Sequence, residues 1–523
     1  MSAATPGMAG VLARGLASAW FSAGVATLCS LWLAPFALSR LDQNEYAIFL
    51  LGNDILLWLT FLDLGLTGAL TARLAPHGAG DSSERDRIAS TGFAAQSFIS
   101  VLTLVVGLGL AWAFPFLFDV PPHHASEVRW VLALLAMATA LTAATKTYNA
   151  ILIANRRLYL NHLTQIWAVL VRTALVAGGL WVGLGLPALA YGTLAATIFT
   201  ALQTRFLVRR HLPLVRLRWS LADQETLKDT WKVGMWFSIN GMSVIVLRTT
   251  DRFIVANMVT LASVTPYVLT GRIYEICQTN LSQIANTTWP LLAELIGQGR
   301  REEALRLWHG ATTLSVLLPV VVGAAFWSAN GVFMRAWVGP AHYAGIWIDS
   351  LLVANMALLV IITSFRSALT GASIVRPQAL WRAGEGILFI ALALALVGTL
   401  GLPGVALAKL VSTIVGCAWM PRRLAPILGV TAGRLAGIVL GRSILTMSLC
   451  LPLAAAGRLF ADAGEGYARA ALTAASVGIL SFIAVLRWGA DEHERLFLAR
   501  KVGSGRFGRW LVRLRLLPRH VNQ

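Results

Sequence analysis

The sequence consists largely of apolar stretches about twenty residues long, separated by short polar segments that carry most of the arginines. A stretch of this length can span the hydrocarbon core of a bilayer as an α-helix. Because 57% of the residues are hydrophobic and only 13% are charged, the chain cannot be a soluble globular protein of ordinary composition. We therefore predict an all-α, polytopic membrane protein.

These stretches predict about fourteen transmembrane helices. Six of these predicted helices precede a strongly basic segment at residues 206–232, and eight follow it. Their approximate bounds are 16–38, 46–72, 89–118, 128–153, 163–183 and 186–205 before that segment, and 233–259, 265–292, 307–329, 346–370, 383–400, 405–419, 435–455 and 467–486 after it. The loops between them are short, and the longest expected on the extracytoplasmic side is roughly 330–345. Such loops leave no room for an extracytoplasmic catalytic domain.

The basic residues of the loops alternate along the chain. Loops rich in arginine and lysine remain on the cytoplasmic side of a membrane, and here the arginines fall mostly in every second loop. The rule places both termini in the cytoplasm, which requires an even number of spans. Because membrane topology explains the net charge of +19, we expect no nucleic-acid partner.

The residue types that commonly bind metals form no recognisable motif. Cysteines occur at positions 29, 277, 417 and 450, all inside apolar stretches and without CxxC or Cys/His spacing. The sequence therefore predicts no metal site, no disulfide framework and no cofactor.

A short pattern repeats between the two halves of the chain. Trp20-Phe21-Ser22 in the first predicted span matches Trp236-Phe237-Ser238 in the seventh. Tyr46 then corresponds to Tyr267 and Asp54 to Glu275, so each half has an acidic residue in its second helix. Two halves in the same orientation are typical of transporters built from parallel repeats, in which the substrate lies between the halves.

We therefore predict two pseudo-symmetric six-helix bundles and two C-terminal helices. The bundles are assigned to residues 1–205 and 233–420, with a cytoplasmic basic linker at 206–232, two accessory transmembrane helices at 421–487 and a basic amphipathic cytoplasmic tail at 488–523. In the tail, arginines alternate with apolar residues, which suits an interfacial helix on anionic membrane lipids.

The seventh and eighth predicted spans carry charges that a lipid-facing helix could not keep. Arg248, Asp251 and Arg252 lie in the seventh span. A polar stripe with helical spacing follows one face of the eighth span and includes Arg272, Glu275, Gln283 and Asn286. A charge at this depth costs about 2.5–3.5 kcal/mol, so these residues are expected to face a cavity or a partner.

The depth of these charges suggests a single patch. At about 1.5 Å per residue from the turn at 261–264, Arg252 and Arg272 fall at nearly the same level, and Arg248 lies near Glu275. The acids Asp251 and Glu275 could simply neutralise the arginines and hold the two helices together. We favour a cationic site for an anionic substrate, because the arginines outnumber the acids and leave positive charge unmatched.

The first half contributes further candidates for a polar lumen. Asp54 and Asp63 lie in the second predicted span, Lys146 in the fourth and Arg172 near the middle of the fifth. Solvation of Asp63 at the cytoplasmic end of its helix, and snorkelling of Lys146 to the cytoplasm, are alternatives for those two residues. The lumen-lining or ion-coupling candidates are Asp54, Asp63, Lys146, Asp251, Glu275, Gln283 and Asn286.

Several loose motifs, spread over nearly the whole chain, resemble a known family. They are DQNEYAIFLL after the first span, FLDLGLTGALTARLA in the second, RTTDRFIVANM in the seventh and WVGPAHYAG between the ninth and the tenth. Together they are similar to the polysaccharide and O-antigen flippases of the multidrug/oligosaccharidyl-lipid/polysaccharide exporter superfamily. The resemblance implies a protein that moves an undecaprenyl-pyrophosphate-linked oligosaccharide across the bacterial inner membrane by alternating access, for O-antigen or exopolysaccharide biosynthesis.

The resemblance also implies which residues and partners are involved. A cationic cavity receives the pyrophosphate and the sugar in this family, and the matching positions are Arg248, Arg252, Arg272 and Arg172. The implied partners are the lipid-linked oligosaccharide, anionic membrane lipids and the glycan polymerase or chain-length machinery. A proton gradient, a sodium gradient or the membrane potential could drive transport.

Two other functions are alternatives. A multidrug or cation antiporter of the same superfamily would use one of the acids to bind a proton or sodium ion, but a net positive lumen disfavours a cationic drug. A membrane polymerase, ligase or glycosyltransferase acting on the same lipid carrier would need a sizeable soluble loop or a carboxylate pair at the membrane surface. Because the loops are too short for this, we predict a transporter and not an enzyme.

Overall fold

The computed structural model describes residues 8–63, 65–74, 82–118, 120, 124–155, 158–212, 217–286 and 288–489. Within these ranges the regular secondary structure is helical, without a β-strand, so the predicted all-α fold is confirmed. The basic tail predicted at 488–523 lies outside the described residues, apart from its first two positions.

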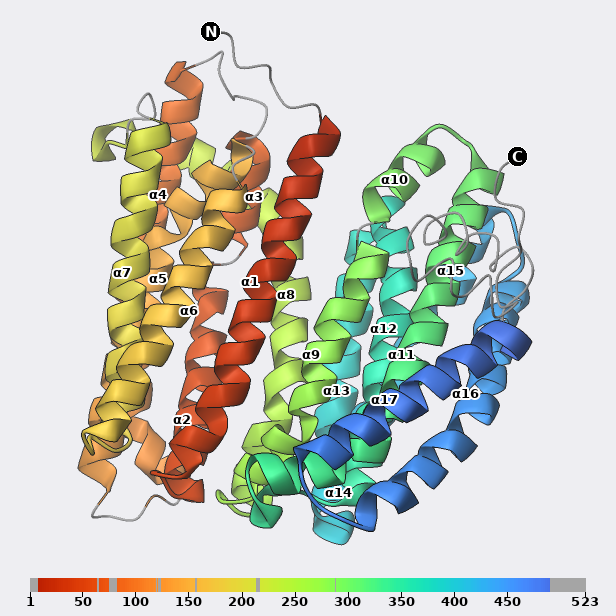
Figure 1. Ribbon diagram of the computed structural model, residues 1–523. Coiled ribbons are helices and arrows are strands. Elements are labelled where there is room, and N and C mark those ends of the chain that lie inside the picture. Colours follow the sequence, from red (N-terminus) through yellow and green to blue (C-terminus); the bar gives the residue numbers. More distant parts are fainter. Residues whose placement is uncertain are drawn as a thin grey trace, which may run out of the picture. The chain divides into compact units, whose positions relative to one another are not determined.

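The chain forms two compact units, residues 1–265 and residues 266–523 (Figure 1). The helices of the first unit are α1 (Met8–Leu38), α2 (Gln43–Trp58), the 3-10 helix η1 (Leu59–Asp63), α3 (Leu66–Leu74), α4 (Ser82–Leu117), α5 (Ala125–Ala154), α6 (Leu158–Trp181), α7 (Pro187–His211), η3 (Trp219–Leu221) and α8 (Gln224–Met258). The second unit contains α9 (Val264–Asn286), whose first residues precede the boundary, α10 (Trp289–Gly297), α11 (Arg301–Trp337), η4 (Pro340–His342), α12 (Ile346–Gly371), α13 (Val375–Leu400), α14 (Leu402–Cys417), α15 (Met420–Leu428), α16 (Ala432–Asp462), α17 (Tyr467–Ala484) and η5 (Val485–Gly489).

Helices of membrane-spanning length dominate both units. Among the described residues, 11 helices are long and apolar enough to cross a membrane, which confirms a multi-pass membrane protein. The predicted spans within α7, α8 and α9 are helical as well but are not among these 11. Helices α8 and α9 contain the charged and polar residues noted in the sequence, so their composition is less apolar. The count of fourteen spans therefore stays a prediction.

Equivalent helices make equivalent contacts in the two units. In the first unit α4 packs on α5, α5 and α6 pack on α7, and α3 packs on α5. In the second unit α11 packs on α12, α12 and α13 pack on α14, and α10 packs on α12. This correspondence confirms two pseudo-symmetric helix bundles. Helices α16 and α17 pack on α11 and on each other, so the accessory helices belong to the second unit.

We had predicted a continuous helix over 46–72 and over 265–292, the second span of each half. In the structure each of these spans is broken. In the first unit α2 is followed by η1 and then by α3, and in the second unit α9 is followed by α10. On the register that aligns Asp54 with Glu275, the start of α3 at Leu66 aligns with position 287, just before α10 begins at Trp289. Gly65 has a φ of 72° at this break, and a Cβ there would lie 2.3 Å from the carbonyl oxygen of Gly234. Only glycine lets α8 approach the break so closely.

Helix α8 packs on the first unit, whereas we had assigned residues 233–420 to the second bundle. Its contacts are with α2, α3 and α4, because polar groups fix its N-terminal part to these helices. Asp223 caps α8 by accepting hydrogen bonds from the amide and the hydroxyl of Thr226, and these bonds lower the pKa of its carboxyl group. Arg73 of α3 donates to the carbonyl oxygen of Thr226 and to the hydroxyl of Thr230. The segment predicted as a linker at 206–232 is therefore partly helical and partly bound to the first unit.

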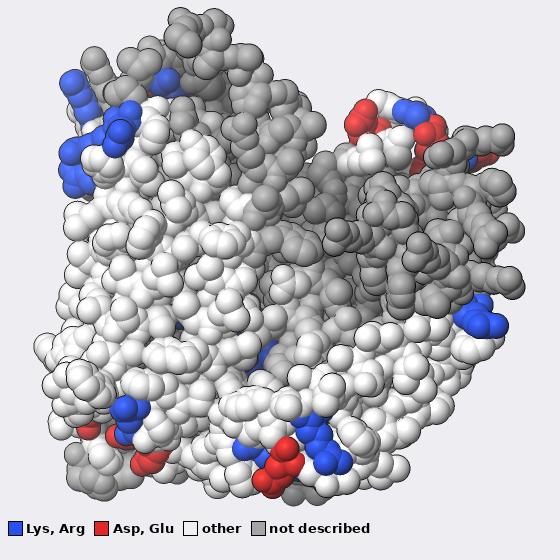
Figure 2. Space-filling model, in the orientation of Figure 1, with Lys and Arg blue, Asp and Glu red and all other residues white. Residues whose placement is uncertain are grey.

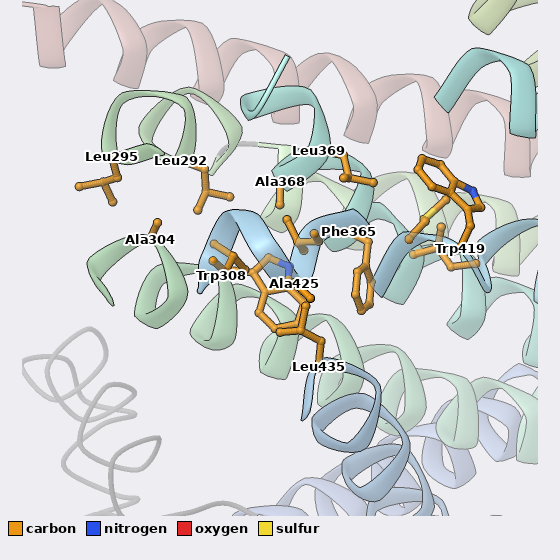
Figure 3. Packing of buried hydrophobic residues seen from close by; sticks show 14 residues of the cluster. Leu292, Leu295, Ala304, Trp308, Phe365, Ala368, Leu369, Trp419, Ala425 and Leu435 are labelled. Carbon is orange, nitrogen blue, oxygen red and sulfur yellow. The ribbon is translucent and has the colours of Figure 1, made fainter. Parts of the chain in front are cut away.

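The apolar interior and the charged surface agree with a membrane environment. In the second unit one core cluster joins α10, α11, α12, α15 and α16 around Trp308, which is fully buried and lies edge-on to Phe365 (Figure 3). In the view of Figure 2 the surface of the first unit is mostly uncharged, and its visible Lys, Arg, Asp and Glu side chains gather mainly toward the two ends of its helices. An uncharged belt between charged ends is the surface that a bilayer requires.

Candidate functional site

Arg252 forms a cross-helix ion pair that the sequence did not indicate. Its Nη1 donates to both carboxylate oxygens of Asp54 on α2, at 3.1 and 2.9 Å. The exposed fractions are only 11% for the arginine side chain and 8% for the aspartate. A second contact supports this packing, since the indole nitrogen of Trp58 donates to Thr249 Oγ1 at 2.7 Å. Arg252 is thus a buried cation already balanced by a carboxylate.

Arg248 differs from Arg252 although it lies one turn earlier on α8. Its side chain is exposed, and it makes no hydrogen bond or ion pair with any residue that the structure describes. It is about 15 Å along the helix from the end of α8 at Met258, which is near the middle of a hydrocarbon core. Asp251 is buried, with 3% exposed, and its carboxylate accepts the backbone N–H of Arg252 at 3.0 Å. Of the two predicted site arginines on α8, Arg248 is thus the one without a counter-charge among the described residues.

Asp63 lies at the break between η1 and α3 and is surrounded by polar groups. Its carboxylate is 3.3 Å from Nζ of Lys146 on α5 and accepts hydrogen bonds from the Thr67 hydroxyl at 2.7 Å and from the Gln96 amide. Asp63 is 7% exposed, so it is not a solvated carboxylate, and Lys146 pairs with it instead of reaching for the cytoplasm. Gln96, on α4, is fully buried and was not among our candidates.

The remaining candidates lie on α6 and α9. Arg172 is half-buried on α6 of the first unit. On α9, Nη1 of Arg272 is 3.4 Å from Oε2 of Glu275, three residues further along the same helix, and both side chains are about one third exposed. Gln283 is half-buried and Asn286 is exposed. The structure thus pairs Arg252 with Asp54 in the first unit, where Arg248 and Asp251 lie on the same helix as Arg252, and it pairs Arg272 with Glu275 in the second unit.

The second unit also has a buried polar network that sequence reasoning missed. Asp349, at the start of α12, is fully buried and accepts hydrogen bonds from Tyr274 and Asn330, both at 2.7 Å, and from Tyr343 at 3.0 Å. Arg458 of α16 donates to the same carboxylate at 3.2 Å and to the Tyr343 hydroxyl at 2.6 Å. Burial raises the pKa of the Tyr343 phenol above its usual range. Arg458 also donates to the carbonyl oxygen of Trp327 on α11, so the network fixes α16 to α11 and α12.

The described residues contain no group of three or more His, Cys, Asp or Glu side chains that could hold a metal ion. The candidate residues can therefore form ion pairs and hydrogen bonds. They comprise the exposed Arg248 on α8, the partly exposed Arg272 and Glu275 on α9, and the buried acids Asp54 and Asp63, each paired with a basic side chain. Such groups can bind and release an anion without covalent chemistry.

Comparison with known proteins gives matches in sequence and in fold. A model of the polysaccharide biosynthesis protein family matches residues 61–335. The Bacillus subtilis (strain 168) protein described as "Uncharacterized membrane protein EpsK" is 22% identical over 406 residues, which cover 74% of this chain and 77% of that protein. An inward-facing multidrug resistance MATE family transporter of the MOP superfamily has a TM-score of 0.65 at 16% identity, covering 78% of this chain and 94% of that chain.

Two further solved structures share the fold. The lipid II flippase MurJ, in an inward closed conformation, has a TM-score of 0.65 at 13% identity and covers 90% of this chain and 98% of that chain. A MOP superfamily transporter from Pyrococcus furiosus, whose description states a reverse polarity of the binding pocket and suggests a different function, has a TM-score of 0.53 at 15% identity, with 80% and 94% covered. The chain thus shares the fold of these solved transporters and of this flippase. Because the family model covers more than half of the chain, the protein belongs to the polysaccharide biosynthesis protein family.

Proposed function

We propose that the protein is a flippase that moves an undecaprenyl-pyrophosphate-linked oligosaccharide across the bacterial inner membrane by alternating access, for O-antigen or exopolysaccharide biosynthesis. The observation that carries this proposal is Arg248, an exposed cation at membrane depth without a protein counter-charge among the described residues. An isolated intramembrane charge is costly and marks a functional site by default. A guanidinium fork binds phosphate oxygens in two-point fashion, so a diphosphate headgroup is the ligand that this group suits best.

The other candidate arginines differ in how directly they could contact the substrate. Arg272 and its neighbour Glu275 are both partly exposed, so a diphosphate could displace the carboxylate from the arginine during transport. Arg252 is held by Asp54 and would contribute mainly long-range positive potential. Arg172, half-buried on α6, remains a further candidate for the first unit. A polar lumen lined in part by Gln283 and Asn286 would let the sugar cross without losing its hydrogen bonds.

The polarity of the site separates this proposal from the alternative of a multidrug or cation antiporter. Asp54 and Asp63, the acids that would bind a cation, are each already paired with a basic side chain. An exposed arginine would repel a cationic drug. The reverse polarity of the binding pocket described for the Pyrococcus furiosus transporter supports the idea that pocket polarity varies within this fold.

Energy coupling and cellular context follow from the same proposal. The membrane potential acts on an anionic headgroup directly. Both termini lie in the cytoplasm by the positive-inside rule. The expected partners are the lipid-linked oligosaccharide, anionic membrane lipids and the glycan polymerase or chain-length machinery.

A cell-based assay tests the role of Arg248. In cells whose surface glycan depends on this protein, we expect Arg248→Ala to stop the glycan from appearing outside while lipid-linked precursor accumulates inside, and Arg248→Lys to retain part of the output. The matched control is Arg210→Ala, which removes another exposed arginine, at the end of α7. Normal glycan output from stably expressed Arg248→Ala protein would refute the site.

A further inference from the structure

One face of α9 is fixed by polar contacts within the second unit. The carbonyl oxygen of Thr270 accepts a hydrogen bond from the side-chain amide of Asn330 at 3.2 Å, and the Thr270 hydroxyl accepts the backbone N–H of Ala344 at 2.9 Å. One turn further along α9, the Tyr274 hydroxyl donates to Asp349 at 2.7 Å. Thr270 and Tyr274 are both buried. Because residues four apart lie on one side of a helix, these contacts anchor a single face of α9.

The polar stripe of α9 lies on the opposite face. A helix turns by about 100° per residue, so the stripe that contains Arg272, Glu275 and Gln283 is centred roughly 160° away from Thr270 and Tyr274. The side chains of the stripe are partly exposed, whereas the two anchors are buried. A rotation of α9 about its own axis would move both faces together. The contacts of the buried face therefore determine the direction in which the stripe points.

These contacts converge on the carboxylate of Asp349, which is fully buried. Its Oδ1 accepts hydrogen bonds from Tyr274 and Asn330, and its Oδ2 accepts hydrogen bonds from Tyr343 and Arg458. An ionised carboxylate is an acceptor only, so this arrangement suits the charged form of the acid. The balancing charge is that of Arg458, whose Nη1 is 3.2 Å from Oδ2 and whose side chain is 10% exposed.

Arg458 links this carboxylate to the accessory helix α16. Its guanidinium lies over the ring of Trp327 on α11, 4.8 Å from the centroid, and its Nη2 donates to the Tyr343 hydroxyl. Gly331 leaves room for this arrangement, since a Cβ there would lie 3.4 Å from Nη2 of the arginine. Arg458 is thus held from several sides. Through Asp349, the accessory helix is connected to the buried face of α9.

Helix packing alone does not require these polar groups. Apolar residues of similar volume can often replace a buried ion pair without loss of stability. A hydrogen bond depends on angle as well as distance, so it restricts the rotation of a helix more than an apolar contact does. The first unit has no such tie at the corresponding position. There Asn53, which aligns with Tyr274, donates to the carbonyl oxygen of Phe49 on its own helix at 2.7 Å.

We propose that Asp349 and Arg458 are positioning residues for α9. They hold this helix, through Tyr274, at the rotation in which the polar stripe with Arg272 and Glu275 faces the substrate path. The accessory helix α16 thereby takes part in transport although its arginine does not touch the substrate. The inference rests on the proposed function only in assigning the stripe to the substrate path.

The reactivity of Cys277 tests the position of α9 directly. Cys277 packs against the buried cluster of Tyr274, Met356 and Val360, so a rotation of α9 exposes its thiol. Two full-length proteins are compared, one in which Cys277 is the only cysteine and one in which Cys417 of α14 is the only cysteine, with alanine at the other native cysteine positions. The rate of labelling by N-ethylmaleimide is measured in membranes.

The key variant is Tyr274→Phe, which removes one hydroxyl group and leaves the ion pair between Asp349 and Arg458 intact. We expect labelling of Cys277 to become about fivefold faster, as the loss of one hydrogen bond predicts, while labelling of Cys417 stays unchanged. Export of the glycan should fall at a constant amount of folded protein.

Arg335→Gln is the matched control. It breaks the partly exposed ion pair between Arg335 and Asp462, which also joins α11 to α16, but it leaves the contacts of Asp349 in place. Neither the labelling of Cys277 nor the export of the glycan should change in this variant.

A double variant separates positioning from stability. Asp349→Leu with Arg458→Met removes both charges and keeps apolar volume, so the unfolding midpoint should remain close to that of the wild type. Labelling of Cys277 should nevertheless be faster and export lower, because Tyr274 has lost its acceptor. Wild-type labelling and export in a stable double variant would show that the network only packs helices. If the double variant does not fold, Tyr274→Phe decides alone.

The two measurements assign each outcome. Wild-type labelling of Cys277 in Tyr274→Phe overturns the positioning role, and faster labelling with unchanged export overturns the role in transport. The export of Arg248 variants is a separate measurement. Normal export from Arg248→Ala together with impaired export from Tyr274→Phe would reject the proposed headgroup site and leave this inference standing.

Discussion

Asp54 of α2 and Glu275 of α9 occupy corresponding positions of the two units but pair in different ways. Asp54 is buried and binds an arginine on another helix, 198 residues further along the chain. Glu275 is about one third exposed and binds Arg272 on its own helix at 3.4 Å. A cross-helix pair in a dry environment fixes two helices together, whereas a same-helix pair open to water can exchange its partner at little cost.

Corresponding positions of the two repeats can thus serve different roles, one in helix packing and one in transport. In the first unit the acid at this position joins α2 to α8, and the same contact region includes the Trp58–Thr249 hydrogen bond and the edge-on ring contact between Trp58 and Phe253. In the second unit the equivalent acid pairs with Arg272 on its own helix, and its neighbour Tyr274 donates a hydrogen bond to Asp349 of α12. The first pair is therefore expected to act on stability and the second on transport.

The largest effect is expected from Asp54→Ala. Removing the carboxylate leaves the Arg252 guanidinium buried without its partner, and breaking a buried pair costs about 3–5 kcal/mol. We expect a large fall in the midpoint of denaturant unfolding in detergent. Glu275→Ala is the matched control in the other unit, and equal losses from the two variants would contradict the distinction drawn between the pairs.

A smaller effect is expected when both members of the buried pair are replaced together. Asp54→Leu with Arg252→Met removes both charges and keeps apolar volume, so it should recover most of the stability lost in Asp54→Ala and remain within about 2 kcal/mol of the wild type. The unfolding midpoint of the double variant measures this recovery. A double variant as unstable as Asp54→Ala would show that the charges themselves, and not their mutual compensation, hold α2 on α8.

The apolar pattern was sufficient to predict the helices, because each depends on residues that are close in sequence, and the Trp-Phe-Ser match between the halves indicated their repeat. Helix lengths follow from bilayer thickness, and each predicted span coincides with helical residues. The breaks after Trp58 and Asn286 were not predicted, and the first break depends on the close approach of α8 to Gly65, which the local sequence does not show. The packing of α8 on the first unit also depends on contacts between distant segments.

The sequence indicated which residues are candidates for the site, but not which residues they pair with. Arg248 and Arg252 were assigned equal roles, because sequence spacing places them on one helix and cannot show that Asp54 lies opposite only the second. Lys146 and Asp63 were separate candidates, and their ion pair joins different helices. The network around Asp349 was missed because its members come from α9, α11, α12, α16 and a loop, with no local spacing to reveal it.

The smallest effect on stability is expected from Glu275→Gln, which tests the partly exposed ion pair between Arg272 and Glu275. Partly exposed ion pairs contribute about 0–1 kcal/mol, and glutamine can still accept a hydrogen bond from Arg272. We therefore expect an unfolding midpoint close to that of the wild type. Transport should change nevertheless, because Arg272 without its carboxylate holds an anionic headgroup for longer and slows its release. Measured glycan export should fall while the amount of folded protein stays constant. Unchanged export together with unchanged stability would show that the α9 pair is outside the substrate path, and a large loss of stability would place Glu275 in the same structural class as Asp54.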